Sequence, residues 1–250
     1  LVLVGHSMGG LLSRMQTIDS GDQFWNIFSE EPFEKMKGDL AKLSDLKNLF
    51  YFQDNQSVAR VITIASPHHG THYSNSLTRW VGQKLFSLPQ MLESQFSDFV
   101  DLNRENLRNI KTLTIPTSVD SLAPDSLFIQ KMAEMGEANR VMFHNIYGDN
   151  SENSWLRFFN ADWIRPGDGV VAVESAKVQS VQSEVGVNEE HAEVHRHPKA
   201  IVEVRRILLD HLESLGRLEK KPTFDSLVVP AGFVPGSNGV TPGEMPMENR

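Results

Sequence analysis

The feature that most constrains the fold is a stretch at the start of the sequence, LVLVGHSMGGLLSRM, in which a serine stands between glycines. The continuously apolar residues 1–4 predict a strand that is buried on both faces in a parallel sheet. Leu11, Leu12 and Met15 recur at helical spacing and predict a helix that begins at Ser7. The chain must therefore pass from a strand into a helix within very few residues.

The glycines explain how so abrupt a turn is possible. Gly5, Ser7 and Gly9 form the pattern GxSxG, which at a strand-to-helix junction is typical of a turn whose serine has a strained backbone. We expect a side chain at Gly5 or Gly9 to collide with the neighbouring backbone. The hydroxyl of Ser7 should then be exposed above the sheet, with the amide of Met8 beside it as an oxyanion donor.

Further strand candidates alternate with helical stretches along the chain. Residues 59–66 (ARVITIAS) and 141–148 (VMFHNIYG) predict buried strands, and residues 166–173 (PGDGVVAV) predict a loop that leads into extended chain. Pro198 begins a predicted helix that ends before Gly216, and its apolar stripe consists of Ile201, Val204, Leu208, Leu212 and Leu215. This alternation predicts an α/β fold with a mainly parallel sheet.

The remaining segments indicate how the chain is organised into domains. Between residues 72 and 133 the apolar residues keep helical spacing, which predicts a helical cap inserted into a domain over residues 1–216. The stretch KGDLAKLSDLKNLF predicts a short surface helix. Residues 217–250 are rich in proline and glycine without periodicity, and we expect a disordered tail there.

The composition narrows the classes of partner and chemistry. The chain has 250 residues, no cysteine and a net charge of −8, because 32 acidic residues outnumber 24 lysines and arginines. This balance gives no basic footprint for a nucleic acid, which is therefore not expected as a partner. The lack of cysteine excludes disulfides, thiolate metal sites and a cysteine nucleophile. No apolar run approaches the roughly 20 residues of a membrane-spanning helix, so no transmembrane segment is expected.

A serine hydroxyl is a poor nucleophile at neutral pH, and it needs a histidine base that an acid holds in place. In the chain order serine, acid, histidine, the base should lie shortly before the last helix, which leaves three candidates. His191 is favoured because it begins the loop after SEVGVNEE. His195 remains an alternative, and His197 is expected to help start the helix.

The acid should lie on a turn beyond a strand. Asp168 in PGDGVV has a glycine on each side and faces a valine pair, as expected of such an aspartate. Asp149 in YGDN is the rival, because it directly follows the third strand candidate. We favour Asp168 and keep Asp149 as the alternative.

A cluster of histidines follows the second strand candidate. His68, His69 and His72 form the pattern HHxxH, which in zinc proteases needs a helix and a glutamate. Here the pattern leaves a strand and enters a turn with proline and glycine. The expected role is therefore to hold the turn beside the site, and neither a metal nor an organic cofactor is expected.

Several blocks of the sequence together resemble bacterial α/β-hydrolases of the lipase and esterase type: GHSMGGLLSRM, RVITIASPHHGTHYSNS, PTSVDSLAPDS, HNIYGD, GDGVVAVESA and HPKAIVEVRRILLDHL. This group includes triacylglycerol lipases and GPI-inositol deacylases, and the resemblance covers residues 1–215. It implies an α/β-hydrolase fold with Ser7 as nucleophile, Asp168 as acid, His191 as base and Met8 as an oxyanion donor. The implied reaction is hydrolysis of a carboxylic ester or lipid through an acyl-enzyme.

The sequence departs from this family pattern at two places. The spacing from His191 to Pro198 is one residue longer than usual, which keeps His195 open as the base. Members of the family also begin with several strands and a histidine-glycine loop that donates a second oxyanion amide. Since nothing of this kind precedes Gly5, we expect the sequence to lack the first strands and to begin at the fifth. A noncatalytic binding module or an inactive fragment therefore stays the alternative to an enzyme.

Overall fold

A computed structural model of the protein describes residues 1–71, 90–110, 122–136, 140–151 and 166–217. The chain divides into two compact units, Leu1–Leu208 and Leu209–Arg250. The sheet and all the helices described below belong to the first unit, except that the last helix continues into the second. The tail predicted over residues 217–250 lies outside the described residues from residue 218 onward, so its disorder stays a prediction.

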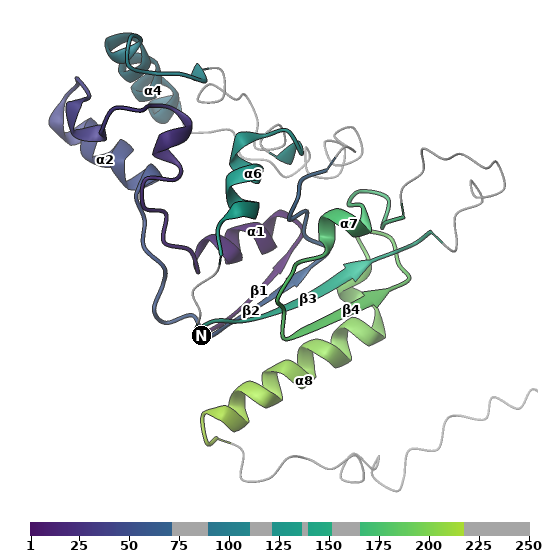
Figure 1. The fold of residues 1–250 in the computed structure, drawn as a ribbon. Helices are drawn as coiled ribbons and strands as arrows, with labels where there is room; N and C mark the ends of the chain where they lie inside the picture. Colours follow the sequence, from purple (N-terminus) through teal and green to yellow (C-terminus); the bar gives the residue numbers. More distant parts are fainter. Residues whose placement is uncertain (72–89, 111–121, 137–139, 152–165, 218–250) are drawn as a thin grey trace, which may run out of the picture. The chain divides into compact units, whose positions relative to one another are not determined.

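Four parallel strands form the sheet of the first unit (Figure 1). They pair in chain order: β1 (Val2–His6), β2 (Arg60–Ile64), β3 (Met142–Gly148) and β4 (Ser183–Val187). In this register Val4 lies opposite Ile62, and Ile62 lies opposite His144. The predicted fold class, α/β with a mainly parallel sheet, is confirmed.

Within the described residues, helices occupy the connections between these strands, and two further helices follow β4. The α-helices are α1 (Met8–Met15), α2 (Leu40–Phe50), α4 (Gln90–Asn103), α6 (Leu127–Glu134), α7 (Val173–Ala176) and α8 (Pro198–Ser214). Short 3-10 helices are η1 (Trp25–Ile27), η2 (Phe33–Lys35) and η5 (Val194–Arg196). Parallel strands need such crossover connections, and these bring each strand's carboxyl end to the same edge of the sheet.

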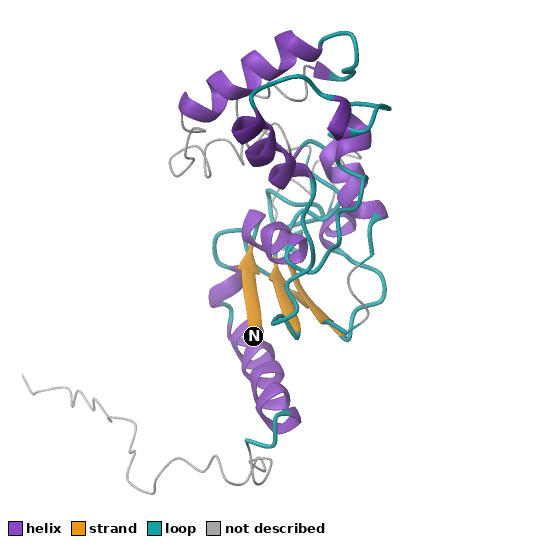
Figure 2. Cartoon of the chain, turned by 90° about the vertical axis from the view of Figure 1, so that its left-hand side faces the viewer, coloured by secondary structure: helices purple, strands orange, loops and turns teal. Residues whose placement is uncertain are grey.

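The sheet is covered by helices on both faces (Figures 1 and 2). Successive side chains of a strand point to opposite faces, so Ile62 and Thr63 of β2 face different layers. Gly10 of α1 lies against Thr63, whereas Ala200 and Ile207 of α8 share an apolar cluster with Ile62. The sheet therefore lies between α1 and α8.

The edge strand β1 is less buried than its apolar sequence predicts. β2 is buried at all five of its positions, whereas β1 is buried only at Gly5, and Val4 is 49 % exposed. Among the described strands, β1 pairs with β2 alone and occupies one edge of the sheet. The prediction that this strand is buried on both faces is therefore wrong for the described residues.

Helix α8 turns a different stripe toward the sheet from the one its sequence predicts. Ala200 and Ile207 are fully buried, while Ile201 is 54 % and Leu208 is 38 % exposed. Val204 of the predicted stripe packs against the same cluster as Ala200 and Ile207. At the other positions the two stripes differ by a single residue, and both have helical spacing, so spacing alone does not choose between them. The helix itself and Val204 are confirmed, but Ile201 and Leu208 of the predicted apolar stripe face outward.

This orientation of α8 on the sheet predicts effects of different size on stability for two alanine substitutions. Ile207→Ala should lower the free energy of unfolding by about 2–4 kcal/mol, because it leaves a cavity beneath the sheet. Ile201→Ala should change it by no more than about 0.5 kcal/mol, since its side chain is largely hydrated. Urea unfolding of both variants measures the difference, and equal losses would contradict this orientation.

A second apolar core lies among the helices beyond the sheet. The indole of Trp25 makes edge-on contacts with Phe33 and Phe50 at ring-centroid distances of 4.9 and 5.3 Å. Phe99 of α4 adds a third edge-on contact at 6.4 Å. Edge-on aromatic pairs add stability beyond the area that they bury, so this cluster ties α4 to a segment far from it in sequence.

The predicted surface helix and the predicted cap both meet at this core. Helix α2 matches the surface helix expected from KGDLAKLSDLKNLF: Asp39 caps it by accepting hydrogen bonds from two backbone amides, and only Leu46 and Phe50 are buried. Helices α4 and α6 fall largely within the predicted cap over 72–133. Residues 72–89 and 111–121 lie outside the described residues, so the bounds of the cap stay a prediction.

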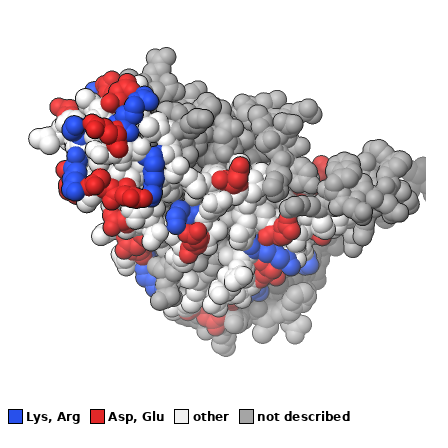
Figure 3. Space-filling view, turned by 45° about the horizontal axis from the view of Figure 1, so that its top comes forward, with Lys and Arg blue, Asp and Glu red and all other residues white. Residues whose placement is uncertain are grey.

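Charges of both signs alternate on the surface of these helices (Figure 3). Lys42 of α2 lies 3.2 Å from Asp98 of α4, and Lys47 lies 2.6 Å from Glu34. These pairs are exposed and add little to stability. None of the described helices is long and apolar enough to span a membrane.

Candidate active site

The backbone turns sharply at Ser7, between β1 and α1. Its φ of 56° and ψ of −128° lie in a region that residues other than glycine rarely adopt. The Ser7 amide donates a 2.8 Å hydrogen bond to the carbonyl of Ile64, at the end of β2. The neighbouring strand thus helps to hold this strained turn at the carboxyl edge of the sheet.

The close approach at this turn depends on Gly5 and Gly10. A Cβ atom on Gly5 would overlap the backbone of Gly9, and one on Gly10 would overlap the side chain of Ser66. A Cβ atom on Gly9 itself would meet no other group within 4 Å. The predicted collision at Gly5 is confirmed. The one at Gly9 is wrong, because it is the backbone of Gly9, and not its missing side chain, that lies against Gly5.

Two alanine substitutions separate these roles. Gly5→Ala should destabilise the fold by about 1–3 kcal/mol, because strand and helix must move apart to accept the new methyl group. Gly9→Ala should leave stability unchanged or raise it by up to about 1 kcal/mol, since alanine favours a helix over glycine. Thermal unfolding compares the two, and a larger loss for Gly9→Ala would contradict the geometry of the turn.

The side chain of Ser7 meets that of His191. Ser7 Oγ lies 2.9 Å from His191 Nε2, although the two residues are 184 positions apart in sequence. His191 follows β4, in the loop before η5. Ser7 and His191 are each only 2 % exposed, so the expectation of an exposed hydroxyl is wrong. The imidazole lies directly against this hydroxyl and shields it from solvent.

Asp168 holds the other side of the imidazole. Its Oδ2 lies 2.8 Å from His191 Nδ1, and its carbonyl accepts a 2.9 Å hydrogen bond from the His191 amide. The second carboxylate oxygen, Oδ1, accepts from the amides of Val170 and Val171 at 3.0 and 2.7 Å. Hydrogen bonds thus offset the cost of burying this carboxylate. With Nδ1 donating to Asp168, Nε2 is left to accept the proton of Ser7.

The alternative residues lie elsewhere. His195 belongs to η5 and is exposed, and Asp149 accepts a 3.1 Å hydrogen bond from the amide of Ser151. His197 accepts a 3.1 Å hydrogen bond from the amide of Lys199 at the start of α8. Within the described part of the chain, no hydrogen bond joins any of the three to Ser7. The structure thus brings Ser7, Asp168 and His191 together and leaves the alternatives apart.

Met8 follows Ser7 directly and is the first residue of α1. The first amides of a helix have no partner within it, and the helix dipole gives this end a partial positive charge. The Met8 side chain packs against an apolar cluster that includes Leu11, Val170 and Val171. Apolar groups therefore border the site, on the side of the valines whose amides hold Asp168.

His6, the residue that precedes Ser7, contacts the backbone of His191, which no sequence pattern predicts. Its Nε2 lies 2.9 Å from the carbonyl oxygen of His191. The His6 ring lies 5.1 Å from the ring of His191 and 4.9 Å from that of His195. Burial lowers the pKa of His6 to about 4, so this side chain is neutral near pH 7. The one available signal is its position in GxSxG, immediately before the serine.

The HHxxH residues do not form a metal site in the described part of the structure. His68 is fully buried, with Nε2 3.3 Å from Thr63 Oγ1. His69 is exposed and has Nδ1 3.3 Å from the carbonyl oxygen of Ser175, and His72 lies outside the described residues. Among those that are described, no group of histidine, aspartate and glutamate side chains could hold a metal ion. The turn at Gly70 instead lies against Pro124.

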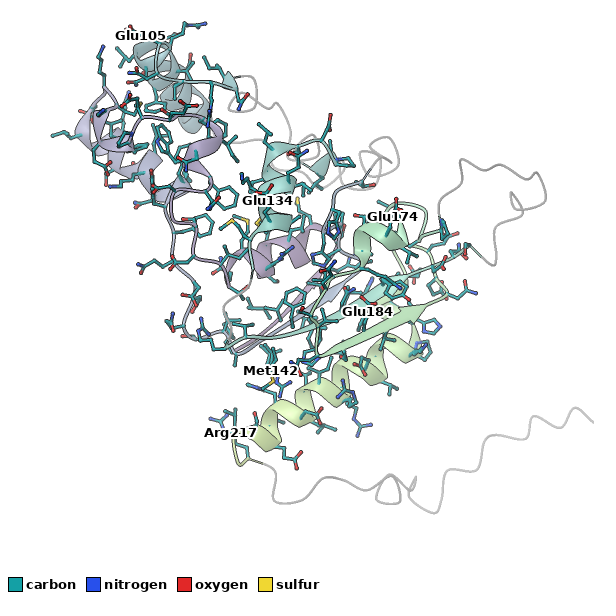
Figure 4. The ribbon with its side chains drawn as sticks, in the orientation of Figure 1. Glu105, Glu134, Met142, Glu174, Glu184 and Arg217 are labelled. Atoms are coloured by element: carbon teal, nitrogen blue, oxygen red, sulfur yellow. The ribbon has the colours of Figure 1, made fainter. Side chains whose placement is uncertain are left out.

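A buried polar chain runs from His68 beneath the site. Thr63 donates a 2.9 Å hydrogen bond to Asn145, and Asn145 donates a 3.0 Å hydrogen bond to Glu184, which is labelled on β4 in Figure 4. Since the hydroxyl proton of Thr63 is used toward Asn145, His68 Nε2 must donate to Thr63. Burial, followed by the charge of Arg14, lowers the pKa of His68 to about 3. The fold therefore holds this histidine neutral.

This burial predicts how stability depends on pH. Between pH 6.5 and about 3, His68 is protonated in the unfolded chain but neutral in the folded one, so its contribution to stability falls with falling pH. One such group gives a slope of up to about 1.4 kcal/mol per pH unit. In His68→Gln the free energy of unfolding should therefore fall less steeply between pH 6 and 4, as measured by urea unfolding. An unchanged slope would contradict the buried neutral state.

Comparison with known proteins finds similarity in solved structures only. The chain matches no protein-family model and no curated protein. It resembles Bacillus licheniformis lipase BlEst2 at 15 % identity with a TM-score of 0.41, covering 83 % of this chain and 65 % of that one. Staphylococcus hyicus lipase is 13 % identical with a TM-score of 0.43, and the match covers 88 % of this chain and 71 % of the lipase. EstA from Clostridium botulinum is 17 % identical to this chain with a TM-score of 0.48, and the match covers 88 % of this chain and 65 % of EstA.

These values describe a likeness in fold alone. The chain spans 65 % of the length of the Bacillus lipase and of EstA, slightly less than two thirds. The fold class, α/β with a parallel sheet, rests on the strands of this chain and on the helices that cover them. Chemistry must be argued from the residues at the site.

Proposed function

We propose that this protein is a serine hydrolase that cleaves carboxylic esters through Ser7, His191 and Asp168. The observation that carries the proposal is the pair of hydrogen bonds to one imidazole, 2.9 Å to Ser7 and 2.8 Å to Asp168. The three groups stand in the order nucleophile, base and orienting acid, in a site that solvent barely reaches. A serine and a histidine in contact by chance would not need the buried carboxylate behind them.

The proposed reaction has two stages. Ser7 Oγ attacks the ester carbonyl while His191 Nε2 takes the hydroxyl proton, and the tetrahedral intermediate collapses as this proton passes to the departing alkoxide. A water molecule then attacks the acyl-serine, and His191 takes its proton and returns it to Ser7. Asp168 keeps Nδ1 protonated and stabilises the imidazolium in both stages.

The negative charge that develops on the carbonyl oxygen needs donors. The amide of Met8 is the proposed donor, since it begins α1 directly after the nucleophile and has the positive end of the helix dipole behind it. One such donor contributes about 10²- to 10³-fold to turnover. None of these steps calls for a metal or an organic cofactor.

An ester with an apolar acyl group suits the surroundings of the site. Met8 packs into the cluster with Leu11, Val170 and Val171, so apolar side chains adjoin both the nucleophile and the acid. Binding an acyl chain against such side chains is favourable because it removes apolar surface from water. The substrate class that we propose is therefore a carboxylic ester, including lipid esters.

Hydrolysis of p-nitrophenyl esters of increasing chain length tests this proposal. The chain should release p-nitrophenol, and Ser7→Ala should reduce the rate to the background. Asp168→Asn should lower kcat by about 10⁴-fold, because the asparagine amide favours the wrong imidazole tautomer. Its remaining oxygen still accepts from the two valine amides, so this variant is a matched control for folding.

Two results would contradict the proposal. One is a cooperatively folded chain without esterase activity, which would favour the noncatalytic binding module or the inactive fragment. The other is activity that survives Ser7→Ala, which would place the chemistry at another residue. Thermal unfolding of each variant separates loss of activity from loss of fold.

A further inference from the structure

The backbone carbonyl of His191 has a partner on β1, the strand that ends just before Ser7. His6 Nε2 lies 2.9 Å from this carbonyl oxygen, and His6 precedes Ser7 in the chain. A carbonyl oxygen only accepts, so Nε2 of His6 must carry the proton and donate it. The last residue of β1 thus donates a hydrogen bond to the loop of His191, and Ser7 follows it directly.

The hydrogen bonds between His191 and Asp168 show what the bond from His6 adds to the position of His191. The His191 amide donates to the carbonyl of Asp168, and Nδ1 faces the carboxylate of the same residue. Both of these bonds tie His191 to the loop of Asp168. The bond from His191 Nε2 to Ser7 Oγ, just beyond the end of β1, must break and re-form during the reaction. The bond from His6 involves neither of the atoms that exchange the Ser7 proton.

The surroundings of His6 suit a neutral donor. Its ring lies close to those of His191 and His195, and the negative charge of Asp168 favours its protonated form less than burial disfavours it. When His191 becomes an imidazolium, a second cation 5.1 Å away would oppose that charge. Burial lowers the pKa of His6 to about 4, which avoids this repulsion at neutral pH.

We propose that His6 is a positioning residue, whose hydrogen bond to the His191 carbonyl holds the base at the correct distance from Ser7 throughout the catalytic cycle. This inference rests on the proposed function. His6 touches neither the substrate nor the transferred proton and acts through the backbone of the loop. Misplacing a reacting group by about 1 Å costs up to about 10²-fold in rate, so removal of the donor should slow the chemical step and leave substrate binding nearly intact.

A matched pair of substitutions tests the hydrogen bond itself. The glutamine side chain in His6→Gln ends in an N–H group that can reach the His191 carbonyl. The methionine side chain in His6→Met is about as long as glutamine but has no hydrogen-bond donor. Both lose the ring contacts equally. With a p-nitrophenyl ester, His6→Met should lower kcat by 10- to 100-fold relative to His6→Gln, with KM changed less than threefold. Equal kcat values for the two variants would overturn the inference.

A second readout does not need activity. The proton on His191 Nδ1, bonded to Asp168, should give a downfield proton NMR signal that is absent in Asp168→Asn. The signal should persist in the wild type and in His6→Gln but broaden by exchange in His6→Met, because the loop is less firmly held. If the wild type hydrolyses no ester, the proposed function fails, and this signal still decides the positioning role. The same signal in both variants would overturn it.

Thermal unfolding accompanies both measurements. Both variants should unfold cooperatively within a few degrees of each other. If His6→Met does not fold, His6→Leu takes its place as a second side chain without a donor. Failure of every donor-free variant to fold, while His6→Gln folds, would assign the hydrogen bond to stability and overturn the positioning role.

Discussion

The structure depends on the close approach of β1 and α1 at Ser7. Without a side chain at Gly5, the backbone of the strand lies against that of Gly9, and the chain reverses within a few residues. This contact forces Ser7 into its strained conformation and fixes its hydroxyl at the carboxyl edge of the sheet. The cost of the strain is offset by the parallel sheet and by α1 packed on it.

Parallel topology explains why residues far apart in sequence meet at this point. Ser7 follows β1, Asp168 lies on the connection from β3 to β4, and His191 follows β4. All of these loops leave the sheet at its carboxyl edge, where open α/β sheets collect functional groups. Hydrogen bonds within its own loop orient the Asp168 side chain. The Val170 and Val171 amides donate to one carboxylate oxygen, and the other oxygen faces His191.

The sequence was sufficient for local features and insufficient for those that depend on tertiary packing. The apolar runs predicted three of the strands, and GxSxG after the first of them located the turn. The place of His191 at the start of the loop favours it over His195, but only the three-dimensional course of that loop brings it to Ser7. The burial of Ser7 also depends on this distant histidine, so no local pattern could predict it.

The errors have the same physical origin. Two stripes of α8 share helical spacing, and the one with Ala200 faces the sheet because it packs with Ile62. The apolar residues of β1 predict a strand covered on both sides, whereas its exposure depends on how many neighbours it has. The contact of Trp25 with Phe99 joins segments whose meeting no periodicity predicts, and the bond from His6 to the carbonyl of His191 is equally non-local.

The central claim is that Ser7 is an activated nucleophile, and mapping a covalent adduct tests it most directly. A fluorophosphonate loses fluoride when an activated serine oxygen attacks its phosphorus, and mass spectrometry of the tryptic digest locates the phosphonate. The account predicts a single adduct on peptide 1–14, assigned by fragmentation to Ser7 and not to Ser13. The adduct should be absent in Ser7→Ala. A folded chain that forms no adduct, or forms it at another serine, would contradict the account.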